Sequence, residues 1–152
     1  MCPIKKRIAP LLCIVLVAGF MGIASGQGEG TKRVKAEKSW TGRLIGKEKE
    51  PLQMLAPAKE YISGPRTFEK VWKAWRTEEK VPDVDFSKKL VLVGTAGGPN
   101  IVNLSAVLNA KGDLTINAMS TLVGGPGFGY GLIVIDRDGV KSVKGKPLEK
   151  DE

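Results

Sequence analysis

The chain has 152 residues and a formal net charge of +8, with no histidine and only two cysteines, both within the first 13 residues. Serine and cysteine nucleophiles usually depend on a histidine base, and zinc sites rely on histidine and cysteine ligands, so the composition argues against both kinds of site. A general acid or base near neutral pH would have to be a carboxylate, lysine or tyrosine with a shifted pKa. We therefore expect no enzyme, no metal site and no cofactor.

The N-terminus has the features of a secretory signal peptide. Three basic residues at positions 5–7 precede the uncharged segment 11–24, which would span about 21 Å as a helix, less than the ~30 Å hydrocarbon core of a bilayer. Ala24 and Gly26 suit the −3 and −1 positions of a signal-peptidase site. The sequence predicts a signal peptide over residues 1–26, cleaved after Gly26 or after Ala24, and a secreted or periplasmic mature protein.

Two other fates of this segment fit the residues less well. A membrane anchor would have to extend over residues 8–24, and Pro10 and the small residues at its end argue against that. A lipoprotein would carry its acylated cysteine at the end of the apolar segment, whereas Cys13 lies near the start. Cleavage would remove both cysteines and three basic charges. It would leave a thiol-free domain of formal charge +5 without a stable membrane span.

The mature sequence predicts one domain with short terminal extensions. Residues 27–38 are glycine-rich and charged, with little to bury, and we interpret them as a flexible leader. A single α+β domain is expected over residues 39–148, and residues 149–152 form a charged tail.

The domain is predicted to open with a strand at residues 39–45, in which Trp40 and Leu44 pack inward. Residues 47–51 are expected to form a loop, and residues 59–62 a short strand.

The clearest predicted element is an amphipathic helix that includes Pro65 in its first turn and ends near residues 78–79. Ser63 is expected to be its N-cap. Glu69 and Lys73 are four residues apart and would pair on the exposed face. Apolar residues recur at i, i+3, i+4 and i+7 and form one core-facing stripe, made of Phe68, Val71, Trp72 and Trp75.

After the helix the hydrophobic period changes to two, which predicts strands. The apolar run within 88–95 is typical of a central strand. Residues 101–108 and 114–120 flank a turn at 109–113 and indicate a hairpin. A buried strand is expected at 130–135, followed by a turn at 136–139 that leads into residues 140–143. The predicted fold class is α+β: a mainly antiparallel β-sheet, as a curled sheet or a small sandwich, with one amphipathic helix packed on it.

Two glycine-rich segments lie at strand ends. Residues 124–131 lack the following helix and the Lys-Ser/Thr pair that phosphate loops need, so we expect no nucleotide site. They are either the tight, bulged start of a strand or a loop that presents aromatic anchors to a partner. If they meet residues 95–100 at one end of the sheet, the two segments would form a shared rim. The candidate partner-binding residues are Gly125, Pro126, Gly127, Phe128, Tyr130 and Asn100.

Two pairs of aspartates are candidate chemical groups. Asp83 and Asp85 would point the same way in an extended chain, about 7 Å apart, and paired carboxylates can hydrolyse glycosides. No sugar-binding residues accompany them, and Asp85 is better interpreted as a turn former. Asp136 and Asp138 match part of a calcium loop, but the remaining ligand positions are missing, which favours a hairpin turn.

The order of elements resembles one family. The helical run 68–75 is followed by Val-Asp-Phe-Ser-Lys-Lys at 84–89, a Leu-Val-Leu-Val strand at 90–93 and a glycine pair. This arrangement is similar to the C-terminal domain of the PrcB-like family, named for a protease-complex subunit, over about residues 61–143. The resemblance implies an exported α+β domain with a non-catalytic role, such as binding and stabilising a secreted protease.

These features predict an exported, non-enzymatic domain that binds or stabilises a secreted or envelope protein. Lysines alternate with glutamates at residues 47–50, which is typical of a solvated surface and argues against nucleic acid as the partner. Two alternatives stay open: a module that binds an anionic envelope polysaccharide through its basic N-terminal half, and a carboxylate-dependent hydrolase.

Overall fold

The computed structural model describes residues 30–149, and the predicted signal peptide with both cleavage sites lies outside that range. In chain order the elements are β1 (Lys32–Val34), β2 (Lys38–Ile45), the 3-10 helix η1 (Lys47–Leu55), β3 (Tyr61–Ile62), α1 (Pro65–Trp75), β4 (Lys89–Gly97), β5 (Val102–Leu108), β6 (Asp113–Ser120), β7 (Gly127–Asp136), β8 (Ser142–Val143) and β9 (Lys146–Pro147). The fold is α+β and mainly antiparallel, which confirms the predicted class.

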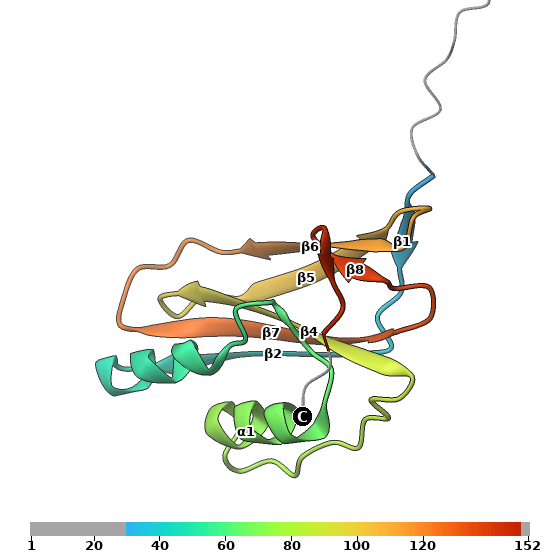
Figure 1. The fold of residues 1–152 in the computed structure, drawn as a ribbon. Coiled ribbons are helices and arrows are strands. Elements are labelled where there is room, and N and C mark those ends of the chain that lie inside the picture. Colours follow the sequence, from blue (N-terminus) through green and yellow to red (C-terminus); the bar gives the residue numbers. More distant parts are fainter. Residues whose placement is uncertain (1–29, 150–152) are drawn as a thin grey trace, which may run out of the picture.

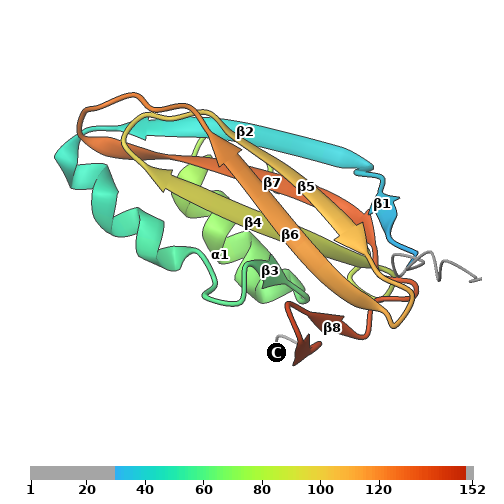
Figure 2. The same cartoon turned by 90° about the horizontal axis from the view of Figure 1, so that it is seen from above.

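The elements form three layers (Figure 1). A central sheet has the strand order β2-β7-β4-β3, and an outer sheet has the order β1-β5-β6-β8-β9. The two open sheets pack face to face, and α1 covers the other face of the central sheet. Every ladder is antiparallel except that between β6 and β8. In Figure 2, η1 lies to one side of the crossed strands β4 and β6.

The helix is amphipathic in the way its sequence predicts. The four residues of the apolar stripe are buried against the central sheet. Glu69 and Lys73 form an ion pair on the exposed side. The indole Nε1 of Trp75 donates to Leu52 O at 2.9 Å, and that of Trp72 donates to Glu79 O at 3.2 Å. These two bonds attach the helix to the segments on either side of it.

The ends of the helix differ from the prediction. The N-cap is Gly64, because the hydroxyl of Ser63 donates instead to Glu149 O at 2.8 Å. The helix ends at Trp75, where Arg76 leaves helical geometry and its N–H closes the last turn on Trp72 O. The guanidinium of Arg76 then reaches the hydroxyl of Tyr130 at 3.1 Å.

Two predictions about irregular segments are wrong. The segment expected as a loop at residues 47–51 forms the first part of η1. The segment expected as a flexible leader at residues 27–38 contains β1, whose residues pair with Leu108, Val107 and Ala106 of β5. The edge of β5 supplies backbone partners that a local pattern cannot reveal. Residues 27–29 of that segment lie outside the described range.

Strand β7 separates two cores. Its residues alternate, so that Leu132 and Val134 pack toward α1 while Ile133 and Ile135 pack toward the outer sheet. The strand lies between β2 and β4, and all its residues but the last are buried. Its position explains the continuous apolar run, since both of its faces are covered. Strand β4 has the same kind of central position.

Candidate functional site

The two glycine-rich segments meet at one end of the sandwich. The N–H of Gly98 donates to Gly127 O at 2.8 Å, and Gly98 forms a β-bridge with Phe128. The N–H of Gly46, which follows β2, donates to Pro126 O at 3.3 Å. Figure 2 shows the loops after β4, β6 and β2 side by side at this end. The rim that the sequence left open therefore exists, and three segments contribute to it.

Asn100 joins these loops through its side chain, which is 4% exposed. Its Nδ2 donates to Gly97 O at 2.6 Å and to Val123 O at 3.2 Å. Its Oδ1 accepts from Val123 N at 2.7 Å and from Thr121 Oγ1 at 2.9 Å. All four contacts are within the chain, so the side chain of Asn100 organises the rim.

Exposed aliphatic side chains gather on this rim. Six large hydrophobic residues are exposed within residues 30–149, and four of them lie here: Ile45, Ile101, Leu122 and Val123. Leu122 is 98% exposed. Ile45 and Ile101 line one shallow hollow together with Arg43. We call these four residues the apolar tip.

Phe128 and Tyr130 do not belong to this surface. Phe128 is 0% exposed and Tyr130 is 3% exposed, and both rings pack against Trp75 with centroid distances of 5.6 and 4.9 Å. The expectation that they are presented to a partner is therefore wrong. Both lie within β7, where even-numbered residues face the helix. Of the other candidates, Gly125 and Pro126 are exposed at the tip, whereas Gly127 is buried.

The glycines of this region have a packing role that explains the unusual sequence. A Cβ at Gly129 would overlap the carbonyl oxygen of Asn100, and one at Gly131 would lie 2.7 Å from Val102 O. The aromatic side chains of β7 pack toward the helix. Glycines alternate with them because the backbone of residues 100–102 lies close against the opposite face of the strand and leaves no room for a side chain. Gly98 has φ +77°, a conformation that favours glycine, and places its N–H toward Gly127.

The tyrosine hydroxyl below the tip is held between two groups. Arg76 Nη1 donates to Tyr130 Oη at 3.1 Å, and that hydroxyl donates weakly to Trp75 O at 3.5 Å. Burial raises the pKa of Tyr130, although the nearby guanidinium opposes the shift. Tyr130 is therefore a neutral, structural hydroxyl near neutral pH.

Asp85 and Asp136 each have a hydrogen-bond or ion-pair partner within the chain. Asp85 accepts from the N–H of Ser87 at 3.0 Å and from its hydroxyl, and these bonds lower the pKa of Asp85. It forms the turn that the sequence predicts. Asp136 pairs with the ammonium of Lys89 at 3.3 Å. In residues 30–149 no three acidic side chains come together in a way that could hold a metal ion.

The candidate residues named from the sequence lie at the same end of the molecule as the apolar tip, but they do not include its four exposed aliphatic residues, Ile45, Ile101, Leu122 and Val123. Two of the four carry a signal in the sequence: Leu122 and Val123 come just after the hairpin strand and Thr121 and precede two glycines, where no further strand position remains to bury them. Ile45 and Ile101 carry no such signal, because their exposure depends on where three loops meet.

Comparison with known proteins gives no match: no family model fits the chain, and neither the curated proteins nor the solved structures contain a similar one. Across residues 30–149, no helix combines the length and apolar character that crossing a bilayer would take. The candidate site of this chain is the apolar tip with its Asn100 scaffold.

Proposed function

We propose that this chain is an exported, non-enzymatic domain that binds or stabilises a secreted or envelope protein, such as a protease, and contacts it through the apolar tip. The observation that carries the proposal is the gathering of four exposed aliphatic side chains at one end of the sandwich, where a buried asparagine fixes the loop that holds Leu122 and Val123. Clusters of exposed apolar side chains on a protein surface typically mark interaction surfaces.

The surroundings of the tip support a protein partner. Arg43 lines the hollow between Ile45 and Ile101, and Glu50 lies close by, with its carboxylate accepting from Gly127 N at 3.2 Å. An apolar centre with a polar margin that includes arginine is the usual composition of a protein interface. The loops are bonded to one another, so binding would cost little ordering of the backbone. The resemblance to the PrcB-like family points the same way.

The proposal is tested by affinity capture from envelope extract with a C-terminally tagged chain. The variant Leu122→Ser/Val123→Ser removes the most exposed part of the tip without touching a core residue. We expect the wild type to recover a protein that this variant does not. Phe128 and Tyr130 are unsuitable for this test, because their truncation would open a cavity in the helical core.

The matched control is Met119→Ser, which removes an exposed apolar side chain from the solvent face of the outer sheet. It should recover the same partner as the wild type. Equal recovery by the tip variant, or recovery of no protein at all, would contradict the proposal. Salt-sensitive retention of both variants on an anionic polymer, without any protein partner, would favour the polysaccharide alternative.

Export is tested separately by cell fractionation with the same tag. We expect a shortened chain, cleaved after Gly26 or Ala24, in the periplasm or the medium. A full-length chain found only in the cytoplasm would reject the secreted or periplasmic location, and with it the class of partner proposed.

A further inference from the structure

Strand β6 has one edge that is covered for only two residues. On one side, residues 114–120 of β6 pair with β5, from Leu108↔Leu114 to Val102↔Ser120. On the opposite edge, β8 pairs only with Asp113 and Leu114. Lys144 and Gly145 then take φ values of 50° and 76° and turn the chain away. Within residues 30–149, no strand lies beside residues 115–120 on this edge.

The main-chain groups of alternate residues face that uncovered edge. Asp113 O accepts from Asn109 N toward β5, whereas Leu114 O accepts from Lys144 N on the other side. Further along, the N–H of Thr121 points toward β5 again, since it donates to Ile101 O. In an antiparallel strand, the N–H and C=O groups of successive residues point alternately to the two sides of the strand. The even-numbered residues Ile116, Ala118 and Ser120 therefore present these groups to the uncovered edge.

This edge carries none of the usual protection against pairing. Natural sheets cover or charge their edges, or interrupt them with proline, because a bare edge is a template for another strand. Residues 115–120 read Thr-Ile-Asn-Ala-Met-Ser, with no charge and no proline. An uncharged edge of this length is therefore suited to receive a strand.

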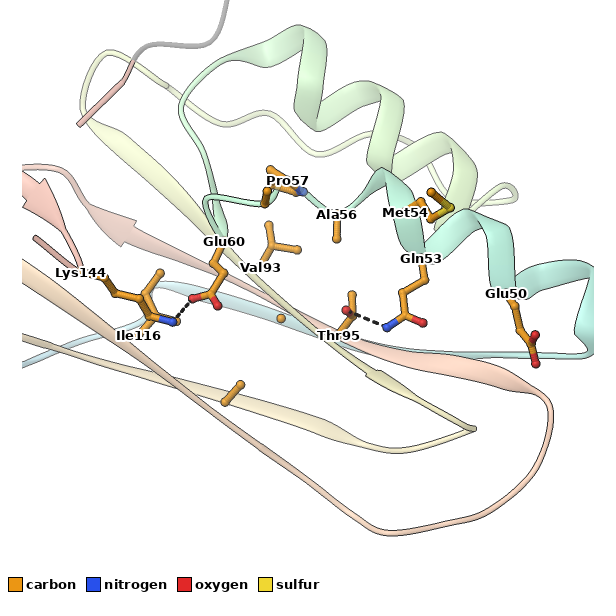
Figure 3. Close-up of a pocket in the computed structure, with 13 residues that line it drawn as sticks. Glu50, Gln53, Met54, Ala56, Pro57, Glu60, Val93, Thr95, Ile116 and Lys144 are labelled. Carbon is orange, nitrogen blue, oxygen red and sulfur yellow. Dashed lines mark hydrogen bonds and ion pairs between the residues drawn. The ribbon is translucent and has the colours of Figure 1, made fainter. Parts of the chain in front are cut away.

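The edge also borders a groove of about 620 Å³ (Figure 3). Its floor is β4 at residues 93–95, and its opposite wall is the last part of η1 with Ala56 and Pro57. Gln53 Nε2 donates to Thr95 Oγ1 at 3.1 Å, which ties that wall to the floor. Next to Gly94 the floor is filled, since an added Cβ would lie 2.6 Å from Leu104 Cδ2 and 3.5 Å from the Cβ of Ala118.

Charges mark the two ends of the groove. Figure 3 shows the ion pair of Glu60 and Lys144 at one end and Glu50 at the other. Glu60 is neutralised by its lysine, whereas the carboxylate of Glu50 has no cationic partner among the described residues and only accepts from Gly127 N. A basic residue at the Glu50 end of a bound segment would complete this arrangement.

We infer that the β6 edge binds an extended segment of a partner protein, which adds as a strand in the groove between β6 and η1. The segment would be uncharged along its middle, with small side chains toward Gly94 and Ala118 and a basic residue near Glu50. Main-chain hydrogen bonds to alternate residues of β6 would give affinity, and the floor of the groove would determine which side chains of the bound segment fit. The site uses main-chain groups rather than the apolar tip, and it stands if the tip proposal fails.

A second copy of this chain fits the edge less well. Strands of two folded sheets pair edge to edge only when both edges are accessible from the side. Here η1 and the residues after it form a wall facing β6 across the groove. A single extended segment can lie in such a groove, whereas a sheet with further strands and loops would meet the wall.

The probe is a phage-displayed library of random linear peptides of about a dozen residues, selected on the purified exported protein. Ala118→Pro removes the edge-facing N–H of Ala118 without removing a bond to β5, and edge positions of this kind are where strands accept proline best. Ala118→Lys places a long charged side chain in the groove and serves if the proline variant does not fold. We expect each to weaken selected peptides about tenfold or more. The controls Asn117→Ser and Leu122→Ser should leave peptide binding unchanged.

Backbone methylation and amide exchange identify the mode of binding. Methylating alternate peptide nitrogens should abolish binding, while methylating the intervening ones should not. In the free protein, the amides of Ile116, Ala118 and Ser120 should exchange quickly and become protected by peptide. The inference would be overturned if no peptide were enriched, or if the selected peptides bound the Ala118 variants as well as the wild type. It would also be overturned if the edge amides were already protected in the free monomer, or if the protein formed a dimer that Ala118→Pro dissociates.

Discussion

Asn100 and Val123 pair across the tip as two strand residues would. The side-chain amide of Asn100 donates to Val123 O at 3.2 Å, and Val123 N donates to the same amide's oxygen at 2.7 Å. One buried side chain thus replaces a strand where β5 has not yet begun and β6 has already ended. This pairing holds Val123, and with it one part of the apolar tip, in place.

Replacing Asn100 by alanine should therefore destabilise the fold and loosen the tip. It leaves Val123 N and the carbonyl of Gly97 without their partner, which costs about 1 kcal/mol because these polar groups are only partly buried. Urea unfolding measures the loss, and amide exchange at Val123 should accelerate. Asn117→Ala on the exposed face of β6 is the control and should change stability by less than about 0.5 kcal/mol. Similar effects of the two changes would contradict the role given to Asn100.

Gly129→Ala should be among the most damaging substitutions in the strand. Its Cβ would overlap the carbonyl oxygen of Asn100, so the backbone of one segment would have to move, at a cost of about 3 kcal/mol. Gly124→Ala is the matched control, because no atom lies within 4 Å of the added Cβ. Thermal unfolding should show a large drop in Tm for the first and little change for the second. A stable Gly129→Ala protein would mean that residues 100–102 do not cross β7 this closely.

Leu122→Ser should leave folding almost unchanged. The side chain is 98% exposed, so its removal forfeits no core contact, and the free energy of unfolding should change by less than about 0.5 kcal/mol. The self-association of concentrated protein, measured by light scattering, should fall if the tip is an accessible apolar surface. A clear loss of stability would instead place Leu122 in a core.

The stability of the protein should fall in alkaline solution partly through Tyr130. Burial raises the pKa of its hydroxyl above the usual value of 10.0, so the folded state holds this proton more tightly than the unfolded state. The contribution of Tyr130 to the free energy of unfolding is fully present below about pH 10. It is lost as the pH rises through the pKa of this hydroxyl in the folded state. The free energy of unfolding, measured with urea, should therefore fall less steeply at alkaline pH for Tyr130→Phe than for the wild type. Each curve is first normalised to its value at neutral pH. Parallel curves would contradict the assignment.

The local sequence pattern was sufficient to predict the elements in which buried residues recur at a regular spacing. The stripe of Phe68, Val71, Trp72 and Trp75 predicts both the helix and the face it buries, because four side chains at helical spacing need one core. The hairpin around residues 109–113 and the central position of β4 follow similarly from turn residues and a continuous apolar run. These features depend on neighbours within a few residues of one another.

The candidate site is formed by segments far apart in the sequence. The local sequence pattern could not show which side chains are exposed there. Gly-Phe-Gly-Tyr-Gly fits an exposed loop and a buried strand equally well, and only the crossing of residues 100–102 over β7 decides between them. The leader becomes β1 because the edge of β5 lies beside it. The groove exists because η1 and β6, separated by more than fifty residues, face each other across β4.

The sequence by itself determined the class of the domain, its helix and hairpin, and the absence of histidine and of cysteine beyond residue 13. Periodic burial and residue chemistry are properties of the chain alone. The tertiary structure decided that aromatic side chains are core and aliphatic ones are surface at the tip, and that one edge of β6 is uncovered. Both outcomes depend on which distant backbones approach closely enough to exclude water or to exchange hydrogen bonds.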